Sequence, residues 1–121
     1  MPLTDFYSYT ITDPSANNLL VAITIDPTHD VYKGHFPQQP VTPGVVLVEI
    51  ARKILSDHLG KNLFFSSAKE LKFMSPILPE QNTQIDLSIT YDEIEDGYKA
   101  ACIFKSDETV FTKLKGTFRA S

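Results

Sequence analysis

The sequence predicts an α+β fold in which a strongly curved antiparallel sheet wraps round one long central helix. Three observations lead to this prediction. Residues 44–59 have the features of a helix, and the first half of this segment is apolar on every side. The segments before and after it alternate apolar and polar residues, as strands do. Most turns between those segments are short, and short connections favour antiparallel neighbours.

Two or three strands are expected before the helix, the third being at most a short extended segment at residues 30–34. Residues 5–12 are rich in aromatic and β-branched residues, and residues 13–18 are typical of a turn. Residues 19–26 alternate regularly, so one face of this second strand is apolar. The residues on that face are Val21, Ile23 and Ile25. We therefore expect a hairpin that places one face on the core.

The boundaries of the helix are well marked. Thr42 is a suitable N-cap, Pro43 suits the first helical position, and Gly60 is a suitable residue to end the helix. The apolar residues of the first half are Val45, Val46, Leu47, Val48, Ile50 and Ala51. Because a surface helix would show a polar stripe, we expect this half to be buried and the polar C-terminal end to emerge toward water.

Four more strands are expected after the helix, at residues 62–75, 83–91, 98–105 and 109–118. In the first of them Phe65, Leu71 and Phe73 share one face, and in the second the inward residues are Ile85, Leu87, Ile89 and Tyr91. A helix that is apolar on all sides needs a sheet that curls round it, or a second subunit that covers the remainder. This architecture is the hot-dog fold, and residues 1–121 are expected to form a single domain.

The composition argues against several classes of function. The net charge of −4 argues against nucleic acid as the main partner, since phosphate binding relies on clustered lysine and arginine. The single cysteine, Cys102, cannot form an internal disulfide and is expected to pack within a strand, which suits a reducing cytoplasm. No segment is long and apolar enough to span a membrane, and the N-terminus lacks the layout of a signal peptide. We therefore expect a cytoplasmic protein.

One stretch, residues 33–51, carries the parts of an acid/base site. It contains His35, three prolines, and a single carboxylate, Glu49, among apolar helical residues. Histidine near its ordinary pKa is a suitable base at neutral pH. A carboxyl group surrounded by valine and isoleucine is expected to have a raised pKa and to serve as a proton donor. Gly44, at the positive end of the helix, offers a backbone N–H to a developing enolate oxygen.

The segment from Gly34 to Glu49 resembles the signature of the FabZ-type 3-hydroxyacyl-[acyl carrier protein] dehydratases. The shared features are the histidine of His-Phe-Pro, the Pro-Gly that starts the central helix, and the acid further along that helix at the same spacing. A weaker similarity lies in Leu71-Lys-Phe-Met-Ser-Pro-Ile-Leu-Pro79. In all, the resemblance covers residues 19–118.

The resemblance implies a dehydratase of 3-hydroxyacyl thioesters that needs no cofactor and no metal. It implies that His35 is the base, that Glu49 is the acid or orients a water molecule, and that the Gly44 N–H binds the thioester carbonyl. It also implies that His35 and Glu49 meet across a dimer interface. The assembly is expected to be a homodimer, a larger assembly of dimers, or a heterodimer with a related hot-dog subunit.

The partner that the resemblance implies is acyl carrier protein, whose pantetheine arm would deliver the acyl chain into an apolar tunnel. Phe36, Val45 and Phe73 are expected to line this tunnel. Because carrier proteins are acidic, docking is expected to use basic side chains. The candidates are Lys33, Arg52, Lys53, Lys69 and Lys72.

Two positions depart from the family pattern, and two other functions stay open. Gln38 stands where the family has glycine, and Lys53 stands where it commonly has glutamine. If Lys53 reached inward, it would hold Glu49 ionised. The alternatives are an acyl thioesterase and a non-catalytic acyl-binding or scaffold subunit. His29 and His58 lack any such context and are expected to be incidental.

Overall fold

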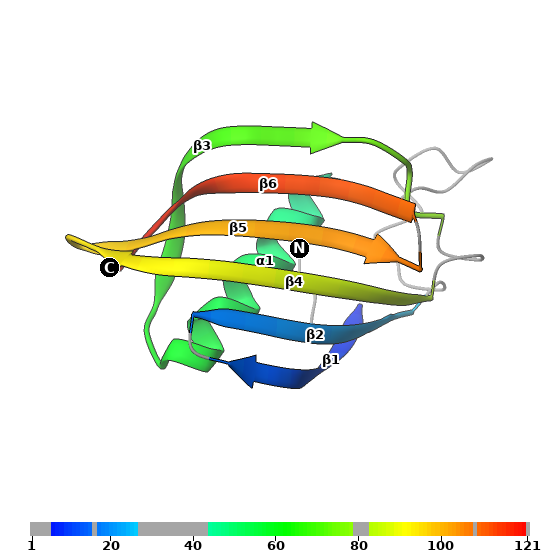
Figure 1. The fold of residues 1–121 in the computed structure, drawn as a ribbon, viewed down its shortest axis with the longest axis horizontal. Coiled ribbons are helices and arrows are strands. Elements are labelled where there is room, and N and C mark those ends of the chain that lie inside the picture. Colours follow the sequence, from blue (N-terminus) through cyan, green and yellow to red (C-terminus); the bar gives the residue numbers. More distant parts are fainter. Residues whose placement is uncertain (1–5, 16, 27–43, 79–82, 108, 121) are drawn as a thin grey trace.

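A computed structural model of the chain describes residues 6–15, 17–26, 44–78, 83–107 and 109–120. These residues form a six-stranded sheet and a helix. The elements are β1 (Tyr7–Ser15), β2 (Asn18–Ile25), α1 (Gly44–Leu59), β3 (Leu63–Phe73), β4 (Gln84–Ile94), β5 (Gly97–Ser106) and β6 (Thr109–Ala120). Every neighbouring pair of strands is antiparallel, and the order across the sheet is β1-β2-β4-β5-β6-β3 (Figure 1). β1 and β3 are therefore the two edges.

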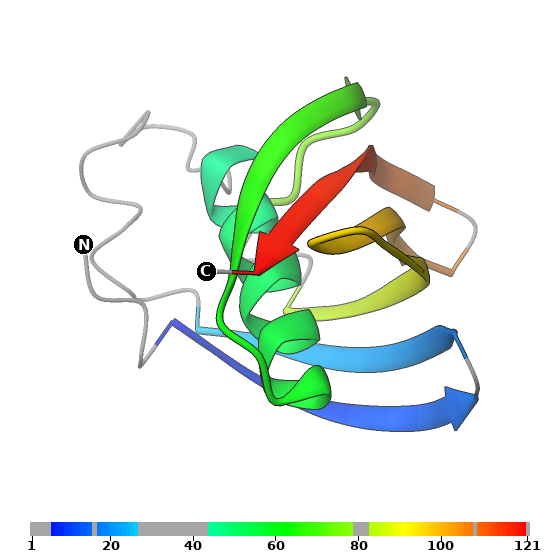
Figure 2. The ribbon, with the colours of Figure 1, turned by 90° about the vertical axis from the view of Figure 1, so that its left-hand side faces the viewer.

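The sheet curves round the helix. Seen from the side, it bends from β1 and β2 at one end to β3 at the other, and α1 lies on its concave side (Figure 2). The buried side chains of the strands come from alternate positions and meet the buried face of α1 in one core. The predicted architecture, a curved antiparallel sheet round one central helix, is confirmed.

The helix has the predicted bounds, and local chemistry explains why. Gly60 follows its last residue with φ 65°, a left-handed conformation in which a side chain would be strained. The Gly60 N–H donates to the Asp57 carbonyl at 3.4 Å, and the Lys61 N–H donates to the Ser56 carbonyl at 3.1 Å. These bonds satisfy carbonyls that the last helical turn leaves without a partner.

The prediction that the first half of the helix is buried on all sides is wrong. Val46, Leu47 and Ile50 are buried, but the side of the helix that carries Val45 is open, and Val45 is 72% exposed. Ile54 and Leu55 in the second half are fully buried instead. The reason is geometric, because the sheet of one chain covers only one side of the helix.

The strands before and after the helix match their expected segments, with two differences. β1 extends to Ser15, so residues 13–15, expected in a turn, pair with β2 across a register shift between Ile11 and Asp13. In β3, register shifts after Phe65 and after Ala68 interrupt the alternation. The expected common face of β3 is therefore lost, and Leu63 is the one buried residue within it. By contrast, all the predicted inward residues of β2 and β4 are buried.

Candidate active site

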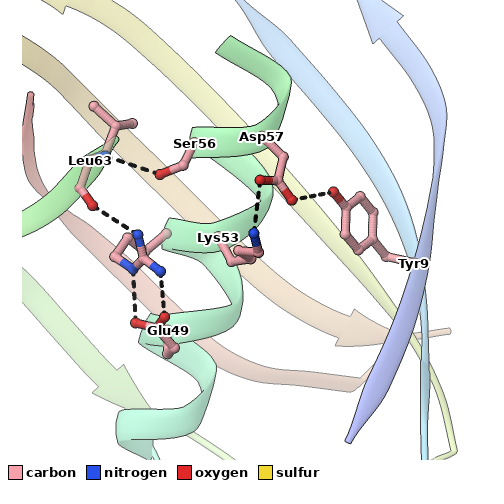
Figure 3. A network of polar contacts seen from close by, with 7 residues as sticks. Tyr9, Glu49, Lys53, Ser56, Asp57 and Leu63 are labelled. Atoms are coloured by element: carbon pink, nitrogen blue, oxygen red, sulfur yellow. Dashed lines mark hydrogen bonds and ion pairs between the residues drawn. The ribbon is translucent and has the colours of Figure 1, made fainter. Parts of the chain in front are cut away.

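Glu49 lies on the open side of α1 and is bound by Arg52, one turn further along the helix. The Arg52 Nε donates to Glu49 Oε2 at 2.9 Å, and a terminal nitrogen donates to Oε1 at 2.5 Å. The other terminal nitrogen donates to the Leu63 carbonyl oxygen at 2.9 Å, at the start of β3. The dashed lines at Glu49 and Leu63 in Figure 3 mark these hydrogen bonds. One side chain thus links the acid to the edge strand.

The pKa of Glu49 is lowered, not raised as the sequence predicts. The hydrogen bonds from Arg52 are the main cause and exceed the opposing effect of burial. The expected burial also fails, because the Glu49 side chain is 44% exposed, twice the 22% of Arg52. Glu49 lies four residues after the exposed Val45, on the same side of the helix. The valines and isoleucine near it in sequence point mostly toward the core.

Lys53 pairs with Asp57, and no hydrogen bond or ion pair joins it to Glu49 in the described part of the chain. Its Nζ lies 3.1 Å from Asp57 Oδ1, and Asp57 Oδ2 accepts a hydrogen bond from the Tyr9 hydroxyl at 3.0 Å (Figure 3). The residue that holds Glu49 ionised is therefore Arg52, and not Lys53 as considered from the sequence. The separation of Glu49 and Arg52, three positions on one helix, is the signal that could have identified the pair.

Two tyrosines of β1 lie near these carboxylates. Tyr7 stacks on Tyr9 with 6.3 Å between ring centroids. Burial, followed by the negative charges of Tyr9, Asp57 and Glu49, raises the pKa of Tyr7 to about 12. The phenol of Tyr7 is therefore neutral at physiological pH. Neither tyrosine was identified as a site residue from the sequence.

Gly44 and Phe73, two predicted substrate-binding residues, lie in contact. A Cβ atom at Gly44 would overlap the Phe73 ring, so the ring packs directly on the first residue of α1. The N–H groups of a first helical turn have no partner within the helix and carry the positive end of its dipole. A larger residue at position 44 would force the Phe73 ring to move. His35 and Phe36 lie outside the described residues.

Exposed apolar side chains lie at this end of the helix and along β3. Val45 follows Gly44 and is 72% exposed, Phe73 is 58% exposed and Met74 is 54% exposed. Leu71 is also exposed, and so is Phe64 at the start of β3. We call these five residues the β3–α1 apolar surface. Large exposed apolar groups that cluster mark sites for apolar ligands or for other protein surfaces.

The basic candidates for carrier docking are distributed over two regions. Arg52 and Lys53 line a polar hollow at the C-terminal end of α1, with Lys61. Lys69 lines a second hollow, of about 430 Å³, together with Lys99 and Lys115. Residues of β3, β4, β5 and β6 contribute to its lining. Small side chains such as Ala101 form part of its lining. Lys99 and Lys115 were missed because only the sheet brings them beside Lys69. Lys33 lies outside the described residues.

The remaining titratable groups of the described residues give no second centre. Cys102 is buried, and burial raises the pKa of its thiol to about 12, which agrees with the predicted packing role. His58 makes an edge contact with the Tyr91 ring at 6.5 Å between centroids. In the described ranges no three His, Cys, Asp or Glu side chains gather in a metal-binding arrangement. No helix in those ranges is long and apolar enough to cross a membrane.

Comparison with solved structures confirms the fold. A chain of the dehydratase heterocomplex ApeI:P from Xenorhabdus doucetiae superposes with a TM-score of 0.72 at 24% identity, over 93% of this chain and 94% of that one. A putative thioesterase from Shewanella oneidensis gives a TM-score of 0.58 at 8% identity, over 93% and 82%. The predicted hot-dog fold is therefore correct.

Sequence comparison assigns the family. The FabZ 3-hydroxyacyl-[acyl-carrier-protein] dehydratase of Geobacter metallireducens is 31% identical over 72% of this chain and 65% of its own length. That of Bacillus velezensis is 31% identical over 50% of this chain, and the match covers 48% of its length. The chain thus spans about half to two thirds of the curated relatives it matches. The family model of the ApeI dehydratases, described as ApeI-like, matches residues 11–114. The chain therefore belongs to the ApeI-like dehydratase family.

Proposed function

We propose that this chain dehydrates 3-hydroxyacyl thioesters, carried on acyl carrier protein, to trans-2-enoyl thioesters. The pathway class is fatty acid or a related polyene or polyketide-type biosynthesis. The observation that carries the proposal is the placement of Glu49 on the open side of α1, in a chain of a dehydratase family. The relatives named as FabZ dehydratases support the same substrate class.

The chemistry divides among three groups. The imidazole of His35 takes the proton from the carbon next to the thioester carbonyl, and the electron pair of that C–H bond forms the new double bond. The C–O bond to the 3-hydroxyl breaks, and the oxygen takes up a proton and leaves as water. The Gly44 N–H binds the thioester oxygen while it carries negative charge. Glu49, held as a carboxylate, accepts a hydrogen bond from the 3-hydroxyl and orients it.

The β3–α1 apolar surface supports the proposed acyl site and the proposed dimer. Phe73 and Val45 lie beside Gly44, so an acyl chain that follows its thioester would contact them. Phe64 and Leu71 lie on β3, an edge strand whose outer backbone groups can pair with another strand. We propose a homodimer in which His35 of one subunit meets Glu49 of the other. The solved ApeI:P heterocomplex makes a heterodimer with a related hot-dog subunit the alternative.

Carrier docking is proposed at the hollow lined by Lys69, Lys99 and Lys115. Three lysines from three strands make this hollow locally positive, although the whole chain carries a net charge of −4. A local positive region of this kind suits an acidic partner. Among the described residues of the lining, Asp92 is the single carboxylate. Glu70 pairs with two lysines, with Lys72 at 3.0 Å and, through its other oxygen, with Lys115 at the longer distance of 3.8 Å. Lys72 is therefore the more closely held of the two.

The test is hydration of a 2-enoyl pantetheine thioester, the reverse reaction, followed by loss of the enoyl absorbance. We expect the wild type to be active and both His35→Ala and Glu49→Gln to lose at least about a hundredfold in rate, as removal of a general base or its partner does. Equal rates for the three proteins would contradict the proposal. Release of free thiol in place of hydration would identify a thioesterase.

The second candidate function is a non-catalytic scaffold subunit. The observation that favours it is the bidentate Arg52 pair, which engages both oxygens of Glu49. A scaffold subunit would be inactive alone and would raise the activity of a catalytic hot-dog partner when the two are mixed. In that case Glu49→Gln in this chain would leave the activity of the complex unchanged.

A further inference from the structure

We propose that Arg52 is a positioning residue that holds Glu49 in its ionised form and in one orientation for the reaction. This inference rests on the proposed function and assigns the state in which Glu49 works. Glu49 then acts as a hydrogen-bond acceptor, and the proton that the leaving oxygen needs comes from the imidazolium formed at His35.

The first support is the geometry of the pair. The guanidinium presents two parallel N–H groups to the two carboxylate oxygens, an arrangement that fixes orientation as well as distance. An ordinary pair of this spacing on a helix surface is worth little, because both side chains move. Here the Arg52 side chain is only 22% exposed. The guanidinium is therefore less mobile than that of a typical surface arginine.

The second support is the anchor on β3. The third nitrogen of the Arg52 guanidinium donates to the Leu63 carbonyl at 2.9 Å, and the Leu63 N–H donates to the Ser56 hydroxyl at 3.3 Å. Leu63 and Ser56 are both buried. Both backbone polar groups of Leu63 are thus bound by side chains of α1. The guanidinium is fixed by a rigid main-chain acceptor, and it fixes the carboxylate in turn.

The third support is what the pair leaves available. A carboxylate can accept about four hydrogen bonds, and the arginine takes two of them. With its side chain 44% exposed, Glu49 keeps acceptor positions for a hydroxyl group or a water molecule. The positive guanidinium beside it opposes protonation, so the available positions accept hydrogen bonds and do not donate them.

Lys53 provides the matched control. It is also cationic, it also lies within one turn of Glu49, and its ammonium binds Asp57 at 3.1 Å. Removal of Lys53 therefore removes one positive charge near Glu49 and leaves the bidentate contact in place. Removal of Arg52 removes the charge, the contact and the anchor together.

The experiment measures the titration of Glu49 directly, by carbon-13 NMR of carboxyl-labelled glutamate, on the assembled protein. The signal of Glu49 is assigned by its loss in Glu49→Gln. We expect Glu49 to titrate below the ordinary value of 4.5 in the wild type. In Arg52→Gln it should titrate clearly higher, in Arg52→Lys between the two, and in Lys53→Gln close to the wild type. An unchanged titration in Arg52→Gln would overturn the inference.

The rate of enoyl hydration by each variant relative to wild type, measured between about pH 4 and pH 8, tests the functional part. Lys53→Gln should follow wild type across this range. Relative to wild type, whose own acid limb comes from His35, Arg52→Gln should lose further rate as Glu49 becomes protonated, with an added slope of at most about tenfold per pH unit. Arg52→Lys should recover part of the lost rate. A merely structural arginine would lower the rate equally at every pH, and that result would overturn the positioning role.

The two readouts separate the inference from the proposed function. An inactive wild type contradicts the proposed dehydratase, and the NMR titration still decides whether Arg52 holds Glu49 as a carboxylate. If Arg52→Gln does not fold, as judged by circular dichroism, Arg52→Lys carries the test. It keeps the charge and loses the bidentate contact, so a titration and pH profile identical to wild type would overturn the positioning role.

Discussion

At the scale of single residues, the candidate site depends on contacts between side chains that one helical turn brings together. Glu49 and Arg52 meet because three positions on a helix bring two side chains to one side. The sequence predicts that Glu49 is the acid and that its pKa is raised, since it has apolar neighbours in sequence. Val46 and Ile50 face the core, whereas Val45 and Glu49 lie on the open side. Only the packing of the sheet determines which side of the helix is covered.

A prediction at this scale concerns Gly44 and Phe73. We expect Gly44→Ala to lower the hydration rate clearly while changing the free energy of unfolding little. The added methyl group would displace the exposed Phe73 ring beside the first helical turn. The change in unfolding free energy should stay within about 1 kcal/mol, as for most substitutions near the surface. Urea unfolding and the enoyl hydration assay measure the two effects.

The contact between Gly44 and Phe73 can be isolated by a double-mutant cycle. Once Phe73→Ala has removed the ring, adding Gly44→Ala should cost much less activity than it does in the wild type. Strictly additive losses of activity would show that the contact between the two residues does not matter.

At the scale of secondary structure, the elements that depend on local chemistry were predictable. The helix bounds follow from the residues that begin and end it, and the turn before β5 follows from Asp96 and Gly97, where Asp96 has φ 64°. The β2 and β4 strands follow from strict alternation. For β3 the residue range was predictable, but which of its side chains face the core was not. Its two register shifts arise from pairing with β6, far along the chain.

The prediction for this scale is that Gly60 is required by its backbone conformation alone. An added Cβ would meet nothing within 4 Å, so space is not the reason for glycine. Gly60→Val should destabilise the protein by about 1–2 kcal/mol, the cost of a left-handed conformation for a branched residue. Gly60→Asn should cost less, because asparagine tolerates that conformation. Equal unfolding free energies for the two variants in urea would contradict this explanation.

At the scale of the whole molecule, one chain leaves its helix partly uncovered and its edge strand β3 lined with exposed apolar groups. The sequence suggested a second subunit as one way to cover such a helix, and the resemblance to the FabZ-type dehydratases implied a dimer. Neither could say which surface is shared, since that depends on which side the sheet leaves open. The β3–α1 apolar surface is the proposed interface.

The matched prediction compares two leucines of almost equal exposure. Leu71 on β3 is 40% exposed and Leu20 on β2 is 39% exposed. Leu71→Asp should shift the protein toward monomers in analytical ultracentrifugation, because it places a charge in the proposed apolar interface. Leu20→Asp should leave the oligomeric state unchanged, since β2 lies away from the β3 edge. The opposite pattern would place the interface on the other end of the sheet.

The central claim is that His35 and Glu49 from two copies of this chain form one dehydratase site. Complementation tests it most directly. Inactive His35→Ala and inactive Glu49→Gln are mixed in equal amounts under conditions that let subunits exchange. Mixed dimers should make up about half of the population, and one of their two sites is intact, so about a quarter of wild-type hydration activity should return. If the subunits exchange and no activity returns, the site is not shared between two copies of this chain.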